Sequence, residues 1–338
     1  ALAAGASKAV PLEFPELSVQ RLHLPAAADL LRQSGPLGAL PAVRQGWLSW
    51  LSAVASAHAH EADVWLAPEA PHAALAPRLL PQPRAKPSST PTVDAAGTYL
   101  ITGGSGGLGT ALVSWLLQEQ RVSPHQIVLL SRRAATPPVD GVRCVAADLG
   151  RPESLDASAA LAAVTDVRGI FHLAGVLDDG LIVNMTEDRL AKVVAPKAGL
   201  LALLAYCARR RLAPQWVLAA SSTSSLLGYA GQSNYCAANG LLDSAATFGA
   251  PAAADAGAPP PPRVLAVNFG PWGEVGMARE GTKAHQLSLA SGEIPMASVA
   301  AISCIAQALR PLADEPPPTP PADAAAAAAA AARPLDRG

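Results

Sequence analysis

A glycine-rich segment in the first third of the chain constrains the fold more than any other feature. It follows an apolar run that ends at Thr102 and precedes a helical stretch that starts at Ala111. Glycines let the backbone approach a pyrophosphate, and the N-terminus of the following helix offers unpaired N–H groups. A purely structural turn is the alternative, but the strand-turn-helix context favours dinucleotide binding. The predicted contacts in this turn are Thr102, Gly103, Gly104, Ser105, Gly106, Gly107, Leu108 and Gly109.

From residue 97 onward, short apolar runs alternate with longer segments of helical character. Segments long enough for crossover helices separate these runs, and several runs are apolar throughout, as expected for strands buried on both faces. The pattern predicts an α/β fold, a Rossmann-like doubly wound parallel sheet with helices on both sides. The predicted strands are residues 98–102, 127–130, 142–147, 169–173, 215–220 and 263–269.

The rest of the chain carries no cluster of chemically active side chains. Residues 1–75 contain one helical pattern, at 41–58, and a short apolar run at 63–67 that is consistent with a strand. Proline-rich sequence follows, and we place a linker at 76–96 and a Pro/Ala-rich spacer at 313–338. This leaves 97–312 as the predicted catalytic domain.

Charge and composition exclude several classes of function. The net charge is −1 and no Lys/Arg-rich run stands out, so a nucleic-acid partner is not expected. We find no uninterrupted apolar stretch of about 18 residues, so we expect no membrane span. The first residues have neither Met nor a basic region, so they do not resemble a signal peptide, and the chain reads as a piece of a longer protein. We expect a cytoplasmic location and leave a plastid one open.

Cysteine and histidine usage indicates no metal site. The four cysteines are widely separated and form no CxxC pair, which favours buried, reduced thiols. None of the seven histidines forms a ligand pattern, so we expect no metal.

The second predicted strand ends in Ser131-Arg132-Arg133, where sheets specific for NAD tend to carry an acidic residue. A basic residue favours the 2′-phosphate of NADP, so we expect NADPH, although two solvated arginines are the alternative. Asp148, after the third strand, is placed to hold the adenine amino group or to cap a helix. The further predicted cofactor contacts are Ser131, Arg132, Asp148, Leu149, Ala174, Gly175 and Pro271.

Four polar residues form a candidate proton-donating group around Tyr235. Tyr235 and Asn239 lie four residues apart, on one face of a predicted helix, and Ser222 follows the strand at 215–220. A free tyrosine has a pKa near 10 and is a poor acid unless its phenolate is stabilised. Lys197 is the candidate for that role. Each residue has an ordinary alternative: packing for the tyrosine, solvation for the lysine and a turn for the serine.

Together these features resemble the short-chain dehydrogenase/reductase superfamily. More narrowly, they resemble the ketoreductase domain of modular polyketide synthases and animal-type fatty acid synthases. Most superfamily members carry Tyr-x-x-x-Lys, whereas here position 239 is Asn and a Lys stands at 197, an exchange characteristic of the synthase ketoreductases. The match covers 97–312, and its motifs are Thr102–Gly109, His172–Gly180, Ala195-Pro-Lys197, Ser221-Ser222, Gly231–Asn239 and Asn268–Gly273.

The resemblance implies an activity and its partners. The substrate would be a β-ketoacyl thioester on the phosphopantetheine arm of an acyl carrier protein, within a multifunctional enzyme whose neighbouring domains continue polyketide or fatty acid biosynthesis. The cofactor would be NADPH. Tyr235 would protonate the alkoxide, Ser222 would hydrogen-bond it, and Lys197 and Asn239 would support the tyrosine. Residues 1–75 would be the remnant of a catalytically inactive structural subdomain.

Further residues bear on stereochemistry. The string Leu177-Asp178-Asp179 resembles the motif of B-type ketoreductases, which give a D-configured hydroxyl. A-type enzymes carry Trp eight residues before the tyrosine, and here that position is Leu227. Ala237 replaces the Pro of the subtype that accepts epimerised α-substituents. Residues 274–296 are predicted to form a lid, with Met277 facing substrate.

Two other functions are considered. One is a stand-alone enzyme of the same superfamily, such as an alcohol dehydrogenase or a sugar epimerase, which Asn239 disfavours. The other is a catalytically silent structural or docking module. Such modules typically lose the glycine turn or the tyrosine, and this chain keeps both.

Overall fold

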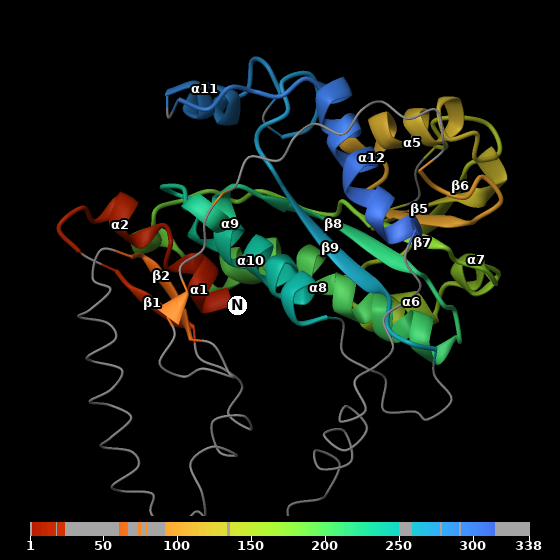
Figure 1. Cartoon of the computed structure of the whole chain (residues 1–338), viewed down its shortest axis with the longest axis horizontal. Helices are drawn as coiled ribbons and strands as arrows, with labels where there is room; N and C mark the ends of the chain where they lie inside the picture. Colours follow the sequence, from red (N-terminus) through yellow and green to blue (C-terminus); the bar gives the residue numbers. More distant parts are fainter. Residues whose placement is uncertain are drawn as a thin grey trace, which may run out of the picture. The chain divides into compact units, whose positions relative to one another are not determined.

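The computed structural model describes residues 2–17, 19–23, 61–66, 74–75, 79, 92–133, 136–249, 259–277, 279–290 and 292–314 (Figure 1). The chain divides into two compact units. One combines Ala1–Glu13 with Pro87–Gly338, and the other is Phe14–Lys86. The domain boundaries predicted from the sequence are not tested by this division and remain a prediction.

The larger unit is built on a six-stranded sheet with the strand order β6-β5-β4-β7-β8-β9. Every neighbouring pair is parallel. The order reverses direction between β4 and β7, as expected for a doubly wound sheet, so the predicted fold class is confirmed. The strands are β4 (Tyr99–Thr102), β5 (Ile127–Ser131), β6 (Arg143–Ala146), β7 (Gly169–His172), β8 (Trp216–Ser222) and β9 (Arg263–Phe269).

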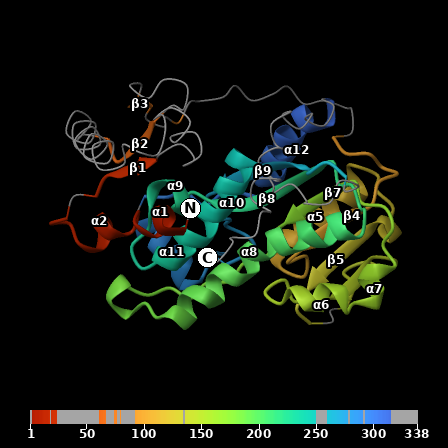
Figure 2. The same ribbon diagram turned by 90° about the horizontal axis from the view of Figure 1, so that it is seen from below.

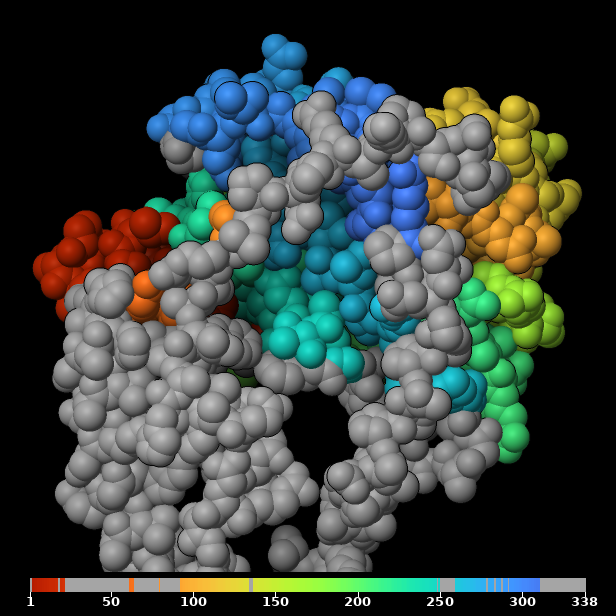
Figure 3. All heavy atoms as spheres, in the orientation of Figure 1, coloured from red at the N-terminus to blue at the C-terminus, as the bar shows by residue number. Residues whose placement is uncertain are grey.

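Side chains of alternating strand residues feed two separate cores, one on each face of the sheet. Ile101 and Phe171 belong to the core beneath α5 (Gly107–Gln118) and α12 (Ser298–Asp314). Leu100 and Ile170 belong to the core beneath α6 (Pro152–Asp156) and α8 (Glu187–Arg209). Figure 1 shows these helix pairs on opposite sides of the strands, and Figure 3 shows α12 (blue) beside the segment around α5 (gold). Both faces are covered, which explains why the central parts of the strands are largely apolar.

The remaining helical elements of this unit lie around the sheet and at its carboxyl edge. They are α1 (Leu2–Ala6), α2 (Val10–Glu13), η2 (Pro124–Gln126), α7 (Ala159–Ala162), η3 (Ile182–Asn184), α9 (Ser224–Leu227), α10 (Ser233–Phe248) and α11 (Lys283–Ala290).

Helix α8 is the longest helix among the described residues. Its N-cap Thr186 accepts a hydrogen bond from the Arg189 N–H. Two acidic residues occupy its first turn, where their negative charges interact favourably with the positive end of the helix dipole. By length and hydropathy alone it is the one described helix that could cross a membrane. Leu200 and Leu203 on α8 are fully buried against the sheet, so this apolar face belongs to the core.

The N-terminal segment packs behind α10. Helix α1 lies beside α10 in both ribbon views (Figures 1 and 2). A Cβ atom on Gly5 would overlap the carbonyl oxygen of Cys236, so the two backbones approach too closely for any larger residue. Lys8 adds a hydrogen bond from its Nζ to the carbonyl oxygen of Leu226, at 3.1 Å.

The smaller unit holds a three-stranded sheet of β1 (Arg21–His23), β2 (Asp63–Leu66) and β3 (Ala74–Leu75). Strand β1 is parallel to β2, and β3 is antiparallel to it. The Arg21 guanidinium donates two hydrogen bonds to Asp63, at 2.7 and 3.0 Å. Strand β2 corresponds to the predicted strand at 63–67, whereas the predicted helix at 41–58 lies outside the described residues.

All four cysteines are free thiols. Cys207 and Cys236 are buried, as expected, and burial raises the pKa of the Cys236 thiol to about 11. The expectation was wrong for Cys304, which is exposed on α12, and Cys144 is only half-buried.

Candidate active site

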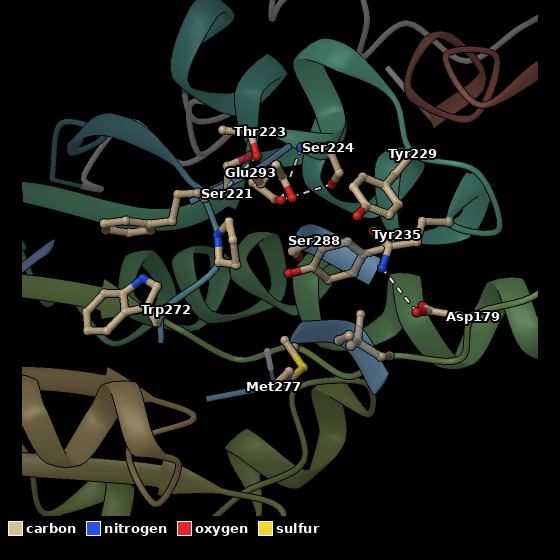
Figure 4. Close-up of a pocket in the computed structure, with 18 of the residues that line it drawn as sticks. Asp179, Ser221, Thr223, Ser224, Tyr229, Tyr235, Trp272, Met277, Ser288 and Glu293 are labelled. Carbon is tan, nitrogen blue, oxygen red and sulfur yellow. Dashed lines mark hydrogen bonds between the residues drawn. The ribbon is translucent and has the colours of Figure 1, made fainter. Parts of the chain in front are cut away.

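One cavity of about 360 Å³ opens at the carboxyl ends of β7, β8 and β9. Three of the four residues predicted to supply a proton line it: Tyr235 from α10, Ser222 from the end of β8 and Lys197 from α8. Figure 4 shows Tyr235, Tyr229 and Asp179 together at one end of the cavity and Trp272 at the other. The fold therefore gathers side chains that lie far apart in the sequence at the edge where ligands of such sheets bind.

Tyr235 is half-buried beside its expected partners. Burial raises the pKa of its phenol, and side-chain hydrogen bonds with Asn239 and Ser222 lower it. The Asn239 side-chain N–H also donates to the Tyr235 carbonyl oxygen at 2.9 Å, one helical turn away. The Asn239 Oδ1 atom is buried and has no partner among the described residues. The phenol thus stays protonated at neutral pH, and the neutral side chains of Asn239 and Ser222 can stabilise its anion by hydrogen bonding.

Lys197 is buried and points to the edge of the sheet. Its Nζ donates to the Ala220 carbonyl oxygen at 2.5 Å. A Cβ atom on Gly175 would lie 3.1 Å from the Lys197 Cε, so this glycine leaves room for the lysine. Burial lowers the pKa of Lys197 to about 8, and the carboxylate of Asp243 acts in the opposite direction. Near neutral pH, this ammonium can therefore give up a proton far more readily than a solvated lysine.

Replacing Lys197 with Met should change the pH dependence of stability. The folded pKa of about 8 lies below the ordinary value of 10.5, so the unfolded chain binds more protons between these pH values. The contribution of Lys197 to the free energy of unfolding therefore rises across this window as the pH rises, and is lost as the pH falls through it. We would measure the free energy of unfolding of both proteins in urea at several pH values. The value for the wild type should rise relative to that for Lys197→Met only inside that window. A difference that stays constant throughout would contradict the buried ammonium.

A second polar network, which the sequence did not predict, lies directly behind Ser222. The Asn268 side-chain N–H group donates to the Asp243 carboxylate at 3.0 Å and to the Ser222 carbonyl oxygen at 3.2 Å. The Ser225 Oγ lies 2.5 Å from the other Asp243 oxygen and 2.7 Å from the same carbonyl oxygen, and its one hydrogen is shared between these two acceptors. The network fixes the end of β8 against α10. One signal was available: Asp243 continues the four-residue spacing of Tyr235 and Asn239 along one helix face.

The glycine turn is shaped for close approach. Gly103 has a φ of +68°, and a Cβ atom on it would lie 2.9 Å from the Ala174 backbone. A Cβ atom on Gly109 would overlap the backbone of Gly104. The N-cap of α5, Gly106, makes no side-chain cap, and both Ser105 and Gly106 are exposed. The first N–H groups of α5 therefore remain available to an anion, which fits a dinucleotide pyrophosphate.

Thr102 has a different place from the other residues of the turn. It is fully buried, and its Oγ1 accepts a hydrogen bond from the Ala174 N–H at 3.2 Å. The same oxygen lies 2.9 Å from Nδ1 of His172, whose pKa burial lowers to about 3. The imidazole is therefore neutral, and its tautomer decides which of the two groups donates this hydrogen bond. Thr102 thus ties the ends of β4 and β7 together under the turn.

The other predicted cofactor residues stand along the same edge, because the parallel register aligns the ends of β4, β5, β6 and β7. Arg132 is exposed, and the Ser131 hydroxyl donates to the Arg133 carbonyl oxygen at 2.6 Å. The Asp148 carboxylate accepts from the Gly150 N–H at 3.0 Å, a local turn contact. Leu149 is buried against Gly199 of α8. Gly175 and Pro271 line the cavity.

The residues predicted to guide the substrate are divided by the structure. Leu177, Asp179 and Met277 line the cavity, and the Gln232 side chain holds Asp179 with a hydrogen bond of 3.1 Å, drawn dashed in Figure 4. Two residues do not line it. Leu227 is 63% exposed, and Asp178 is turned towards α8.

Two cations on α8 hold Asp178. Arg189 donates to its Oδ1 at 2.9 and 3.0 Å, and Lys192 donates to its Oδ2 at 2.9 Å. The hydrogen bond from Lys192 has the largest effect on the Asp178 carboxyl, and together with those from Arg189 it lowers the pKa of that group. Arg189 also donates to the Asp179 carbonyl oxygen at 2.5 Å. Asp178 therefore anchors the loop, while Asp179 faces the cavity.

The predicted lid contains α11. Val275, Met277, Ala284, Ser288 and Glu293 of this segment line the cavity. Among the residues that the structure describes, no group of three His, Cys, Asp or Glu side chains lies close enough to hold a metal ion.

Comparisons with known proteins agree on one family. A family model described as the KR domain matches residues 97–274. The polyketide synthase GfsB of Streptomyces halstedii is 36% identical over 231 residues, which cover 63% of this chain and 4% of GfsB. A 6-methylsalicylic acid synthase of Arthrobotrys oligospora is 33% identical over 200 residues, which cover 51% of this chain and 11% of that protein. The chain therefore spans a small fraction of these curated relatives.

A solved structure described as an A1-type ketoreductase superposes with a TM-score of 0.68 at 26% identity. The superposition covers 92% of this chain and 62% of that one. The likeness extends beyond the part of the chain that the family model matches.

Proposed function

The chain belongs to the KR domain family, the ketoreductases of polyketide synthases, and on that premise we propose that it reduces a β-ketoacyl thioester with NADPH. The thioester would be carried on the phosphopantetheine arm of an acyl carrier protein, and the product would be a D-configured β-hydroxyacyl thioester. The observation that carries the proposal is the single cavity lined by Tyr235, Ser222 and Lys197 at the edge that bears the glycine turn.

Two features support NADPH as the cofactor. The uncapped N-terminus of α5 and the close-packed glycines form a cradle that suits a pyrophosphate. At the end of β5 stands the exposed Arg132, where an enzyme specific for NAD tends to carry an acidic residue. A guanidinium there can pair with a 2′-phosphate in a bidentate manner.

The proposed reaction divides the work between cofactor and protein. A bound NADPH supplies hydride to the β-carbon. Tyr235 donates its phenol proton to the carbonyl oxygen, and the Ser222 hydroxyl hydrogen-bonds the same oxygen as negative charge develops on it. The raised pKa of Tyr235 keeps the phenol in the acid form that reduction needs. The hydrogen bonds from Ser222 and Asn239 then stabilise the phenolate left behind.

Lys197 would return the proton to Tyr235. Its lowered pKa of about 8 means that the ammonium and the amine are both accessible near neutral pH. Asn239, whose Oδ1 has no partner among the described residues, would help to complete the path. The negative charge of Asp243 raises the pKa of Lys197 and so favours its protonated form, the form that holds the proton to be returned.

The loop at 177–179 supports B-type stereochemistry. Asp179 faces the cavity and Asp178 anchors the loop, so the substrate would enter along this side and present one face of its carbonyl to the hydride. Leu227 occupies the position of the A-type Trp and is exposed. Met277 and the segment around α11 would cover the bound chain.

The parent protein would be a multidomain synthase whose neighbouring domains supply the carrier and process the product. We propose a cytoplasmic location for it. The named relatives come from Streptomyces and Arthrobotrys, organisms without plastids, so nothing supports the plastid alternative.

The test is an assay with the 3-oxobutanoyl thioester of N-acetylcysteamine, followed through loss of the reduced nicotinamide absorbance. We expect turnover with NADPH, weaker turnover with NADH, and a D-configured alcohol on chiral chromatography. Turnover to the opposite hand would retain the ketoreductase and reject the B-type assignment. NADPH binding without turnover would instead identify a silent module.

A further inference from the structure

A carboxylate from the N-terminal segment joins two loops at the rim of the active-site cavity. Glu13, the last residue of α2, accepts a hydrogen bond from the Ile182 N–H at 2.6 Å through its Oε2. Its Oε1 accepts another from the Gly231 N–H at 2.9 Å. Glu13 does not line the cavity.

The two loops carry much of the substrate side of the cavity. The first supplies Leu177, Asp179, Gly180 and Leu181, and the second supplies residues 229–232, directly before Tyr235. They touch each other through the Gly180 N–H, which donates to the Gly231 carbonyl oxygen at 2.7 Å. A change in their separation would therefore move Asp179 relative to Tyr235.

The anchor of Glu13 is itself firm. Helix α1 packs on α10, where Gly5 lies against Cys236, and Lys8 binds the carbonyl oxygen of Leu226. Glu13 is half-buried, so water competes only in part for its two backbone donors. Hydrogen bonds between a carboxylate and N–H groups are charge-assisted and stronger than neutral ones. Through Glu13, the positions of both loops are therefore fixed relative to α10, the helix that carries Tyr235.

We propose that Glu13 is a positioning residue for the thioester substrate, which sets the spacing of the two loops and thereby the face of the ketone presented for reduction. The inference rests on the proposed function. Glu13 acts through the main chain at Ile182 and Gly231, and it touches neither the substrate nor the cofactor edge. Its loss should therefore alter substrate affinity and stereochemical outcome and leave cofactor binding unchanged.

The direct test is Glu13→Gln in the full chain. The amide keeps the size of the side chain but offers one acceptor oxygen, so one of the two N–H groups loses its partner. With the 3-oxobutanoyl thioester of N-acetylcysteamine, KM should rise about tenfold, which corresponds to about 1.4 kcal/mol, and the share of the minor enantiomer should rise by a similar factor. The Kd of NADPH and kcat should stay within about twofold. Glu16→Gln, an exposed glutamate three residues further on, is the matched control.

A second variant removes the donor instead of the acceptor. Ile182→Pro deletes the N–H at the first position of η3, where proline is well tolerated. Leu181 before it already has φ −57° and ψ 151°, the conformation that a following proline requires. Ile182→Ala controls for the lost side chain. Ile182→Pro should raise KM and the minor enantiomer beyond Ile182→Ala, and should add less in the Glu13→Gln background than alone.

The outcomes separate the two proposals. A wild-type chain that binds NADPH but never reduces the thioester rejects the proposed function, and the inference with it. Wild-type turnover with an unchanged KM and enantiomer ratio in Glu13→Gln overturns the inference alone. Should Glu13→Gln fail to fold, full additivity between Ile182→Pro and a Glu13→Asp exchange would overturn it equally.

Discussion

Replacing Tyr235 with Phe should lower kcat/KM for thioester reduction about 10²- to 10⁴-fold, the range that one positioned general acid contributes. The exchange removes only the phenol oxygen and keeps the ring in its half-buried place on α10. Because Tyr235 lies on the substrate side of the cavity, the Kd of NADPH should stay within about twofold of the wild type. Stopped-flow reduction kinetics and a fluorescence titration of NADPH would measure the two quantities separately.

Tyr206→Phe is the matched control for this experiment. Tyr206 is fully buried on α8 in the core beneath the sheet, and it does not line the cavity. Its loss of a hydroxyl should leave turnover close to that of the wild type. Turnover by Tyr235→Phe equal to that of this control would remove the tyrosine from the proposed mechanism and direct attention to Ser222 or Lys197 as the proton donor.

Replacing Gly103 with Ala should weaken NADPH binding about 10- to 100-fold, or about 1.4 to 2.8 kcal/mol, through backbone strain in the cofactor turn. The residue has a φ of +68°, and the added methyl group would lie 2.9 Å from the backbone of Ala174. The turn can relieve this clash only by moving away from β7, which shifts the N-terminus of α5. Calorimetric titration with NADPH would measure the loss.

Gly249→Ala separates the two causes of that effect. Gly249 also has a positive φ, +79°, but a Cβ atom on it would meet nothing within 4 Å. It lies at the C-terminal end of α10, away from the turn. This variant should lose stability to urea through left-handed strain, about 1 kcal/mol, and should bind NADPH normally. Equal losses of NADPH affinity in both variants would show that global destabilisation, and not the turn, is measured.

The sheet could be predicted from the sequence because each strand is a continuous apolar run. The prediction ended β8 at residue 220, two residues too early, because hydrophobicity stops there. Ser221 and Ser222 continue the strand through their pairing with Asn268 and Phe269 of β9. Polar residues in a strand are visible only when the partner strand is known, and here the last of them carries a candidate catalytic hydroxyl.

The parts of the site that escaped prediction depend on distant contacts. Glu13 has no local signature, since its two partners lie 169 and 218 residues away. Asp178 and Asp179 are adjacent in sequence, and only the position of Arg189 on α8 shows which of them is the anchor. Tyr235 and Asn239 could be paired in advance because helical spacing is local. Lys197 and Ser222 were joined to this pair by their chemistry and their order along the chain, but only the fold shows that all of them meet at one edge of the sheet.

The packing of the N-terminal segment on α10 also dictates an order of events during translation. Residues 2–13 leave the ribosome well before the Gly231 partner of Glu13, which follows 218 residues later. At ~5–20 residues per second, the segment waits roughly 10 to 40 seconds for its docking surface. Closing so long a loop is entropically costly and slow, so the sheet can form before the segment arrives. A segment made well before its docking surface is then among the last parts of this unit to pack in place, and the rim of the cavity becomes complete only at that late step.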